Sequence, residues 1–166
     1  EPKLTLRGQI LADGEPITCP FEPVPEAPGI FGKDYTGVPE VVDWNGDGRL
    51  DLLVGGYVTG RIFYFENVGV EADGLPILTA RGPLEADGEI FDVIWQASPT
   101  ARDIDSDGLP ELVTGSMFMS ASGGEEAPAG RPGLFMLKNR GTAAAPVLSQ
   151  VSFPLDGNWQ ETFLLN

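Results

Sequence analysis

Two acidic loops of nearly identical pattern constrain the fold of this chain more than any other feature. They read Asp43-Trp-Asn-Gly-Asp-Gly-Arg-Leu-Asp51 and Asp103-Ile-Asp-Ser-Asp-Gly-Leu-Pro-Glu111. Calcium takes about six to eight oxygen ligands, and such loops direct side-chain oxygens inward from positions 1, 3 and 5 and a backbone carbonyl from position 7. Glycine at position 6 allows the sharp turn around the ion. The spacing therefore predicts two calcium sites.

The last carboxylate of each loop decides which kind of site it is. An EF-hand needs a glutamate at position 12, but Val54 and Thr114 stand there, so an EF-hand is a poor fit. The carboxylate comes at position 9 and leads into a strand-like run. The alternative, a pair of plain hairpin turns, rests on the turn preference of Asn, Asp and Gly. The predicted ligands are the side chains of Asp43, Asn45, Asp47, Asp51, Asp103, Asp105, Asp107 and Glu111, and the carbonyls of Arg49 and Leu109.

The similarity continues downstream of the loops. Gly60-Arg-Ile-Phe-Tyr-Phe-Glu-Asn67 and then Pro76-Ile-Leu follow the first loop, while Gly133-Leu-Phe-Met-Leu-Lys-Asn139 and then Pro146-Val-Leu follow the second. Asp43 to Asp103 spans 60 positions and Asn67 to Asn139 spans 72, so the second copy carries 12 extra residues. Such a repeat of strand-like runs is typical of a propeller or another repeated β architecture. We expect strands at 38–43, 50–56, 61–67, 76–82, 98–103, 110–115, 133–138 and 146–152.

This order of motifs resembles the FG-GAP/VCBS repeat over residues 38–153, although Glu111 replaces the usual Asp and Pro110 stands beside it. The resemblance implies blades of a calcium-binding β-propeller, such as the integrin alpha-chain head, with a structural ion in a loop between adjacent strands of a blade. We therefore expect an all-β fold of four-stranded antiparallel blades. Two blades do not close a ring of about four or more, so the resemblance implies a partial propeller completed by other segments or chains.

The expected organisation follows these repeats. Residues 1–37 form a strand of a preceding blade and a proline-rich excursion, and residues 38–97 form the first blade with the loop at 43–51. Residues 98–153 form the second blade with the loop at 103–111 and an insertion at 116–132, and residues 154–166 start a following blade. Asp13-Gly-Glu15 and Asp87-Gly-Glu89 turns precede the two loops equivalently.

Charge and composition exclude several classes of function. The chain has 25 acids, 10 bases and a net charge of −15, which argues against nucleic acid as a partner. No apolar run is long enough to cross a membrane, so we expect no membrane insertion. We found no signal peptide, and interpret the chain as mature or a fragment. Cys19 is the only cysteine, which excludes an intrachain disulfide, and we expect it to be buried.

The sequence carries no catalytic residues that we would assign. It has no histidine, and carboxylate pairs such as Glu71 with Asp73, or Glu125 with Glu126, are typical of solvated loops. We expect a calcium-stabilised extracellular, cell-surface or periplasmic β-propeller module for protein interaction, adhesion or assembly, because calcium loops of weak affinity suit compartments rich in calcium. Its expected partners are further propeller blades or protein subunits.

A second hypothesis is the propeller part of a secreted carbohydrate-binding protein or polysaccharide-degrading enzyme, with glycans as ligands. Sugars stack on exposed aromatic rings, and Trp44 is the first candidate because position 2 of the loop points away from the ion. A tryptophan that covers the end of a blade is the alternative interpretation. The further aromatic candidates are Trp95, Trp159, Tyr57 and Tyr64.

Overall fold

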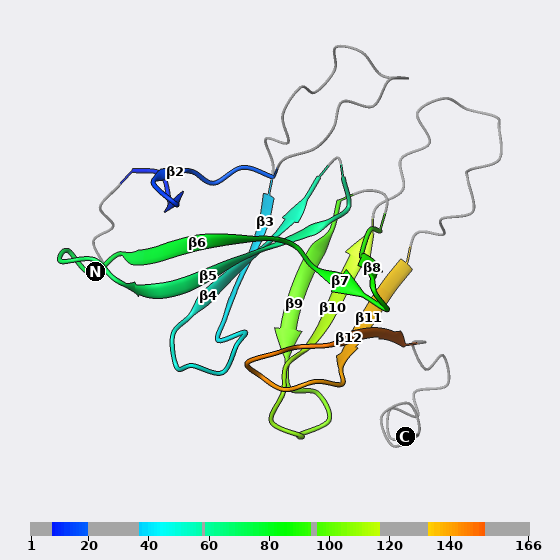
Figure 1. The fold of residues 1–166 in the computed structure, drawn as a ribbon. Helices are drawn as coiled ribbons and strands as arrows, with labels where there is room; N and C mark the ends of the chain where they lie inside the picture. Colours follow the sequence, from blue (N-terminus) through cyan, green and yellow to red (C-terminus); the bar gives the residue numbers. More distant parts are fainter. Residues whose placement is uncertain (1–7, 20–36, 58, 94–95, 117–132, 152–166) are drawn as a thin grey trace, which may run out of the picture.

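The chain is all-β, and its strands form two curled sheets of the same internal order (Figure 1). The computed structural model describes residues 8–19, 37–57, 59–93, 96–116 and 133–151. One sheet has the order β2-β1-β6-β5-β4-β3 and the other β8-β7-β12-β11-β10-β9. Because the order recurs with the numbering advanced by six, the structural repeat is a six-stranded unit rather than the four strands expected from the sequence.

The expected four-stranded blades make up most of each sheet. In the first, antiparallel pairing joins β3 (Gly37–Val42), β4 (Asp51–Gly56), β5 (Ile62–Val70) and β6 (Pro76–Pro83). In the second it joins β9 (Ser98–Arg102), β10 (Glu111–Ser116), β11 (Gly133–Asn139) and β12 (Leu148–Val151). All eight expected strands are present, and the largest differences are a longer β5 and a shorter β12.

Two short hairpins complete the sheets. They consist of β1 (Leu11–Ala12) with β2 (Glu15–Pro16), and of β7 (Glu85–Ala86) with β8 (Glu89–Ile90). Each adds in parallel to the outermost strand of its own blade, through β1 on β6 and β7 on β12. Asp13 and Asp87 take positive φ angles of 52° and 54° at the hairpin turns. Their carboxylates accept hydrogen bonds from the backbone N–H groups of Ala80 (2.9 Å) and Gln150 (3.0 Å), which tie each turn to the blade.

The two sheets pack against each other through one apolar cluster. Alternate residues of β4 and β5, among them Leu53 and Ile62, face the second sheet and are fully buried. The opposite face of β5 packs Phe63 and Phe65 against the N-terminal segment, where Cys19 is buried as expected. The cluster between the sheets, called the interblade core here, consists of Trp44, Leu53, Ile62, Leu84, Ala86, Phe91, Val93, Ala97, Ala101, Leu112, Leu137 and Leu148.

Strands β3 and β4 of the first sheet lie close to β9 of the second sheet without pairing with it. A Cβ at Gly55 would overlap the carbonyl of Ala97 and would lie 2.7 Å from Cδ of Pro99, so only glycine fits in β4 at this point. Pro39 lies in β3, an edge strand, where the missing N–H donor is tolerated. Pro39 thus lies within the strand expected at 38–43.

Parts of the expected organisation lie outside the described residues, namely 20–36 of the proline-rich excursion, 117–132 of the insertion and 154–166 of the following blade. Within the described part of the chain, no helix is long and apolar enough to span a membrane.

Candidate cation-binding loops

Both acidic loops lie at the same end of the two sheets (Figure 1). The first connects β3 to β4 and the second connects β9 to β10, so each joins an edge strand of a sheet to the strand beside it. Equivalent connections in two copies of one unit place the loops at equivalent points. The fold therefore presents two copies of one loop on a shared surface.

The first loop is closed by its own carboxylates. Asp43 accepts hydrogen bonds from the backbone N–H of Asp47 (3.0 Å) and of Gly48 (2.9 Å). Asn45 Oδ1 accepts from the same Asp47 N–H (3.1 Å), and Asp47 Oδ1 accepts from the Arg49 N–H (2.8 Å). That last hydrogen bond, opposed by burial and aided by Asn45 and the Arg49 charge, lowers the pKa of Asp47. The side chains at positions 1, 3 and 5 thus turn toward the inside of the loop.

The second loop repeats this pattern bond for bond. Asp103 accepts from the N–H groups of Asp107 (3.1 Å) and Gly108 (3.0 Å). Asp105 accepts from Asp107 N–H (3.2 Å), and Asp107 accepts from Leu109 N–H (2.8 Å). The agreement extends the sequence repeat to the local conformation.

Positive φ angles occur at positions 4 and 6 of both loops. At position 6 they are 85° for Gly48 and 88° for Gly108, which explains glycine there. At position 4 they are 72° for Gly46 and 65° for Ser106. A Cβ at Gly46 would lie 2.6 Å from Cβ of Ala143, which lies in the connection from β11 to β12. The first loop therefore contacts the second blade directly.

Asp51, the position-9 carboxylate of the first loop, is buried and has several donors. Its Oδ1 accepts from the N–H of Asn67 (2.7 Å), and its Oδ2 accepts from the N–H of Trp44 (3.0 Å) and the hydroxyl of Tyr64 (3.2 Å). Burial raises the pKa of Asp51, and these hydrogen bonds oppose the shift. Asp51 thus links the loop to β5 through hydrogen bonds from Asn67 and Tyr64.

Glu111, the equivalent residue of the second loop, differs in one decisive respect. It is 0 % exposed, and its Oε2 accepts from the N–H of Ile104 (2.9 Å), but its Oε1 has no hydrogen-bond partner. Burial raises the pKa of Glu111 and the charges of Asp105 and Asp107 add to the shift, while the backbone N–H groups of Ile104 and Asp105 oppose it. A buried carboxylate oxygen without a donor is costly unless a cation compensates it.

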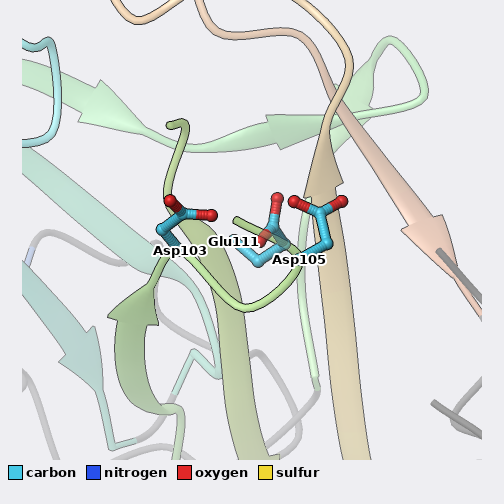
Figure 2. Close-up of side chains that lie close together, drawn as sticks. All are labelled: Asp103, Asp105 and Glu111. Atoms are coloured by element: carbon cyan, nitrogen blue, oxygen red, sulfur yellow. The ribbon is translucent and has the colours of Figure 1, made fainter. Parts of the chain in front are cut away.

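Two further carboxylates face this glutamate. Asp103, Asp105 and Glu111 each offer an oxygen, and these oxygens lie within 4.8 Å of one another and point into the same space (Figure 2). Among the described residues, this is the one place where three or more such side chains gather so closely. Hard carboxylate oxygens in a compact loop suit calcium or magnesium rather than softer metals. The residues of the second loop therefore fit a hard divalent cation.

Two side chains beside the loops were not singled out by the sequence argument. Glu66 Oε1 accepts a hydrogen bond from Asn45 Nδ2 (3.2 Å), and the ammonium of Lys138 pairs with Asp105 Oδ2. Glu66 and Lys138 are equivalent in the repeat, since each directly precedes the asparagine of an Asn-x-Gly motif. That position in the repeat was the available signal, because it places both residues on the strand beside the loop.

The Asn-x-Gly motifs themselves have a structural role. Asn67 donates from Nδ2 to the carbonyl of Leu50 (3.0 Å) and accepts from the N–H of Gly69 (3.1 Å). Asn139 accepts from the N–H of Gly141 at 2.9 Å. Each asparagine therefore stabilises the irregular backbone that follows it, and the first also attaches the acidic loop to β5.

Of the aromatic candidates for sugar stacking, the structure describes Trp44, Tyr57 and Tyr64. Trp44 is 1 % exposed and belongs to the interblade core, so its proposed role as the first sugar-stacking residue is wrong. Position 2 does point away from the loop interior, but toward the packed sheets rather than toward solvent. Tyr64 is partly buried and donates to Asp51. Trp95 and Trp159 lie outside the described residues.

Of the two carboxylate pairs considered for catalysis, the structure describes Glu71 with Asp73, and both residues line a cavity of about 590 Å³ beside β6. Glu71 and Asp73 lie in the exposed connection from β5 to β6, where Asp73 accepts from the N–H of Leu75 (3.2 Å). Glu125 and Glu126 lie outside the described residues.

The family comparison matches the segment that contains both loops. Residues 43–114 match the FG-GAP-like repeat. The match confirms the resemblance inferred from the sequence and, with the two curled sheets, supports a β-propeller-type module. It runs from Asp43, the first residue of the first loop, to Thr114 in β10, and so includes both loops. No curated protein and no solved structure matches the chain.

Proposed function

We propose that this chain is a calcium-stabilised β-propeller module that acts outside the cytoplasm in protein interaction, adhesion or assembly. The observation that carries the proposal is Glu111, a fully buried carboxylate whose Oε1 has no donor and which faces Asp103 and Asp105. A divalent cation would supply the positive charge that this oxygen lacks. The first loop is included in the proposal because its ligand spacing and backbone conformation match those of the second, although both oxygens of Asp51 have donors.

The residues that would bind the cation in the second loop are Asp103, Asp105, Asp107 and Glu111, with the carbonyl of Leu109. In the first loop they are Asp43, Asn45 and Asp47, with the carbonyl of Arg49 and with Asp51. Folding brings oxygens of Asp103, Asp105 and Glu111 within 4.8 Å of one another in the second loop, and like charges this close repel each other. Cation binding therefore favours the folded state over the unfolded one.

The kind of loop supports the proposal of an extracellular, cell-surface or periplasmic setting. Extracellular calcium modules work with dissociation constants of about 0.1 to 1 mM, a range that suits compartments where calcium is abundant. The net charge of −15 agrees with a soluble surface and disfavours anionic partners.

Assembly with further blades is supported by comparing equivalent residues of the two sheets. Ile62 on β5 is 0 % exposed because it faces the second sheet. Its equivalent on β11, Leu134, is 61 % exposed. Leu134 thus leaves an apolar side chain open on the face of the second blade that corresponds to the packing face of the first, although Met136, two residues on along the same face, is 0 % exposed. A third blade, from the same or another polypeptide, is the partner that this face fits.

The carbohydrate alternative has no comparable support. Its first aromatic candidate, Trp44, is buried in the interblade core. Glycan binding therefore remains a second proposal, testable with a glycan array in the presence of calcium.

The test is calcium binding with a thermal readout. We expect calorimetry to detect calcium binding to the wild-type chain, and we expect a chelator to lower its melting temperature. Asp47→Ala and Asp107→Ala should each reduce the bound calcium, and Glu111→Gln should weaken binding at the second loop. Glu89→Gln, which alters an exposed carboxylate of β8, is the matched control and should change neither readout.

The protein is equilibrated with about 1 mM calcium, close to the dissociation constants of extracellular modules. Two results together would refute the proposal: elemental analysis finds no bound calcium, and the chelator leaves the melting temperature unchanged. A Glu111→Gln variant with unchanged binding would remove the observation on which it rests.

A further inference from the structure

Lys138 places a positive charge inside the second loop. Its ammonium pairs with Asp105, and the side chains are only 14 % and 9 % exposed. The equivalent pair in the first loop is Glu66 and Asn45, in which the Asn45 amide donates to Glu66 (3.2 Å). The residue beside loop position 3 is thus negatively charged in the first loop (Glu66) and positively charged in the second (Lys138).

The two differences between the loops complement each other. Where the ligand at position 3 is an amide, its neighbour on β5 is an acceptor, Glu66. Where the ligand is a carboxylate, Asp105, its neighbour on β11 is a cation, Lys138. The second loop has four carboxylates and the first has three, so Lys138 compensates the additional charge. This pairing points to a function of Lys138 toward the loop rather than toward solvent.

We propose that Lys138 is the internal cation of the second loop, which stabilises the ion-free loop and lowers its affinity for a divalent cation. The inference rests on the proposed cation binding. The ammonium and a bound cation compete for Asp105, because both are positive and both need its carboxylate. Little water screens charges at this depth, so the repulsion between the Lys138 ammonium and a bound cation is strong. Binding at the second loop therefore requires Lys138 to release Asp105.

The consequence is a difference between the loops. In the first loop the basic partner is Arg49 of the loop itself, which pairs with Asp47 where the side chains are 41 % and 25 % exposed. In the second loop the basic partner comes from the neighbouring strand and the pair is more deeply buried. Loss of calcium should therefore disturb the second loop less than its four carboxylates suggest. Lys138 tunes the response of the module to calcium without being a ligand.

The experiment isolates the second loop. In an Asp47→Ala background, which disables the first loop, Lys138→Met should raise the affinity of the second loop for calcium by about tenfold or more in calorimetric titrations. The same substitution should lower the melting temperature in chelator and widen the gap between the melting temperatures with and without calcium. Lys138→Arg should retain the low affinity. Arg140→Met, which removes the same charge two positions away on an exposed side chain, is the control for net charge.

Each outcome decides between separate conclusions. Unchanged calcium affinity in Lys138→Met, with binding intact at both loops, overturns the inference and leaves the proposed function standing. An equal drop in melting temperature with and without calcium assigns Lys138 a purely structural role and also overturns it. Binding that appears only in Lys138→Met supports it most strongly. Absence of calcium binding in every variant refutes the inference and the proposed function together.

Discussion

The equivalent positions Ile62 and Leu134 offer a direct test of how the two sheets are packed. Ile62 is 0 % exposed in the interblade core, and Leu134 is 61 % exposed on the second sheet. Truncation of each to alanine removes three carbon atoms from an aliphatic side chain. The chemistry of the two substitutions is therefore nearly the same, and the difference in their effect reports the packing alone.

The magnitude follows from burial. At about 0.8 kcal/mol per buried carbon, Ile62→Ala loses about 2.4 kcal/mol of transfer free energy, and the remaining cavity brings the cost to about 3 to 4 kcal/mol. Leu134 is 61 % exposed, so Leu134→Ala should cost about 1 kcal/mol or less. The difference of about 2 kcal/mol or more is a large part of the stability of a domain this size.

Urea unfolding in saturating calcium, followed by tryptophan fluorescence, measures both costs. We expect the midpoint to fall markedly for Ile62→Ala and little for Leu134→Ala, with unchanged slopes. Equal costs would refute the arrangement of the two faces. In sedimentation experiments Leu134→Asp should reduce self-association of the chain, because it places a charge on the face proposed to receive a further blade. Self-association as strong as in the wild type would contradict that part of the reasoning.

Gly46→Ala should destabilise the chain by about 2 to 4 kcal/mol, from its positive φ and its overlap with Ala143, and Ala143→Gly should restore part of the loss. Ser106→Ala, at the equivalent position, should stay within about 0.5 kcal/mol, and a cost as large as that of Gly46→Ala in chemical denaturation would contradict the contact between the first loop and the second blade. Asp13→Ala and Asp87→Ala should each cost about 1 to 2 kcal/mol, because the hairpin loses its side-chain hydrogen bond to the blade and alanine tolerates the positive φ poorly. The backbone hydrogen bonds from the same residues to Leu78 and Leu148 remain. Hydrogen exchange at the N–H groups of Ala80 and Gln150, which donate to these carboxylates, should become faster. Unchanged protection there would contradict the role of these hydrogen bonds.

Much of the fold could be predicted because its signals are local. Acidic loop, strand and Asn-x-Gly motif recur in the same order, and the backbone requirement for glycine at Gly48 and Gly108 can be recognised without any contact. The eight strands of the blades and the positions of both loops followed from this. The hairpins at Asp13 and Asp87 were recognised only as turns, since a two-residue strand has no periodicity to detect.

The candidate site divides in the same way. The sequence by itself determined the acidic loop pattern, the oxygen-bearing side chains proposed as ligands and the branched strands that follow, because side-chain chemistry and spacing along one segment are sufficient for these. Only the tertiary structure decided that Trp44 is buried, that Glu111 retains an oxygen without a donor, and that Lys138 pairs with Asp105. These properties depend on which strands lie side by side and which face of a sheet is covered. Distances between residues far apart in the chain are set by packing, so a repeat unit predicts two similar loops but not the opposite charges that accompany them.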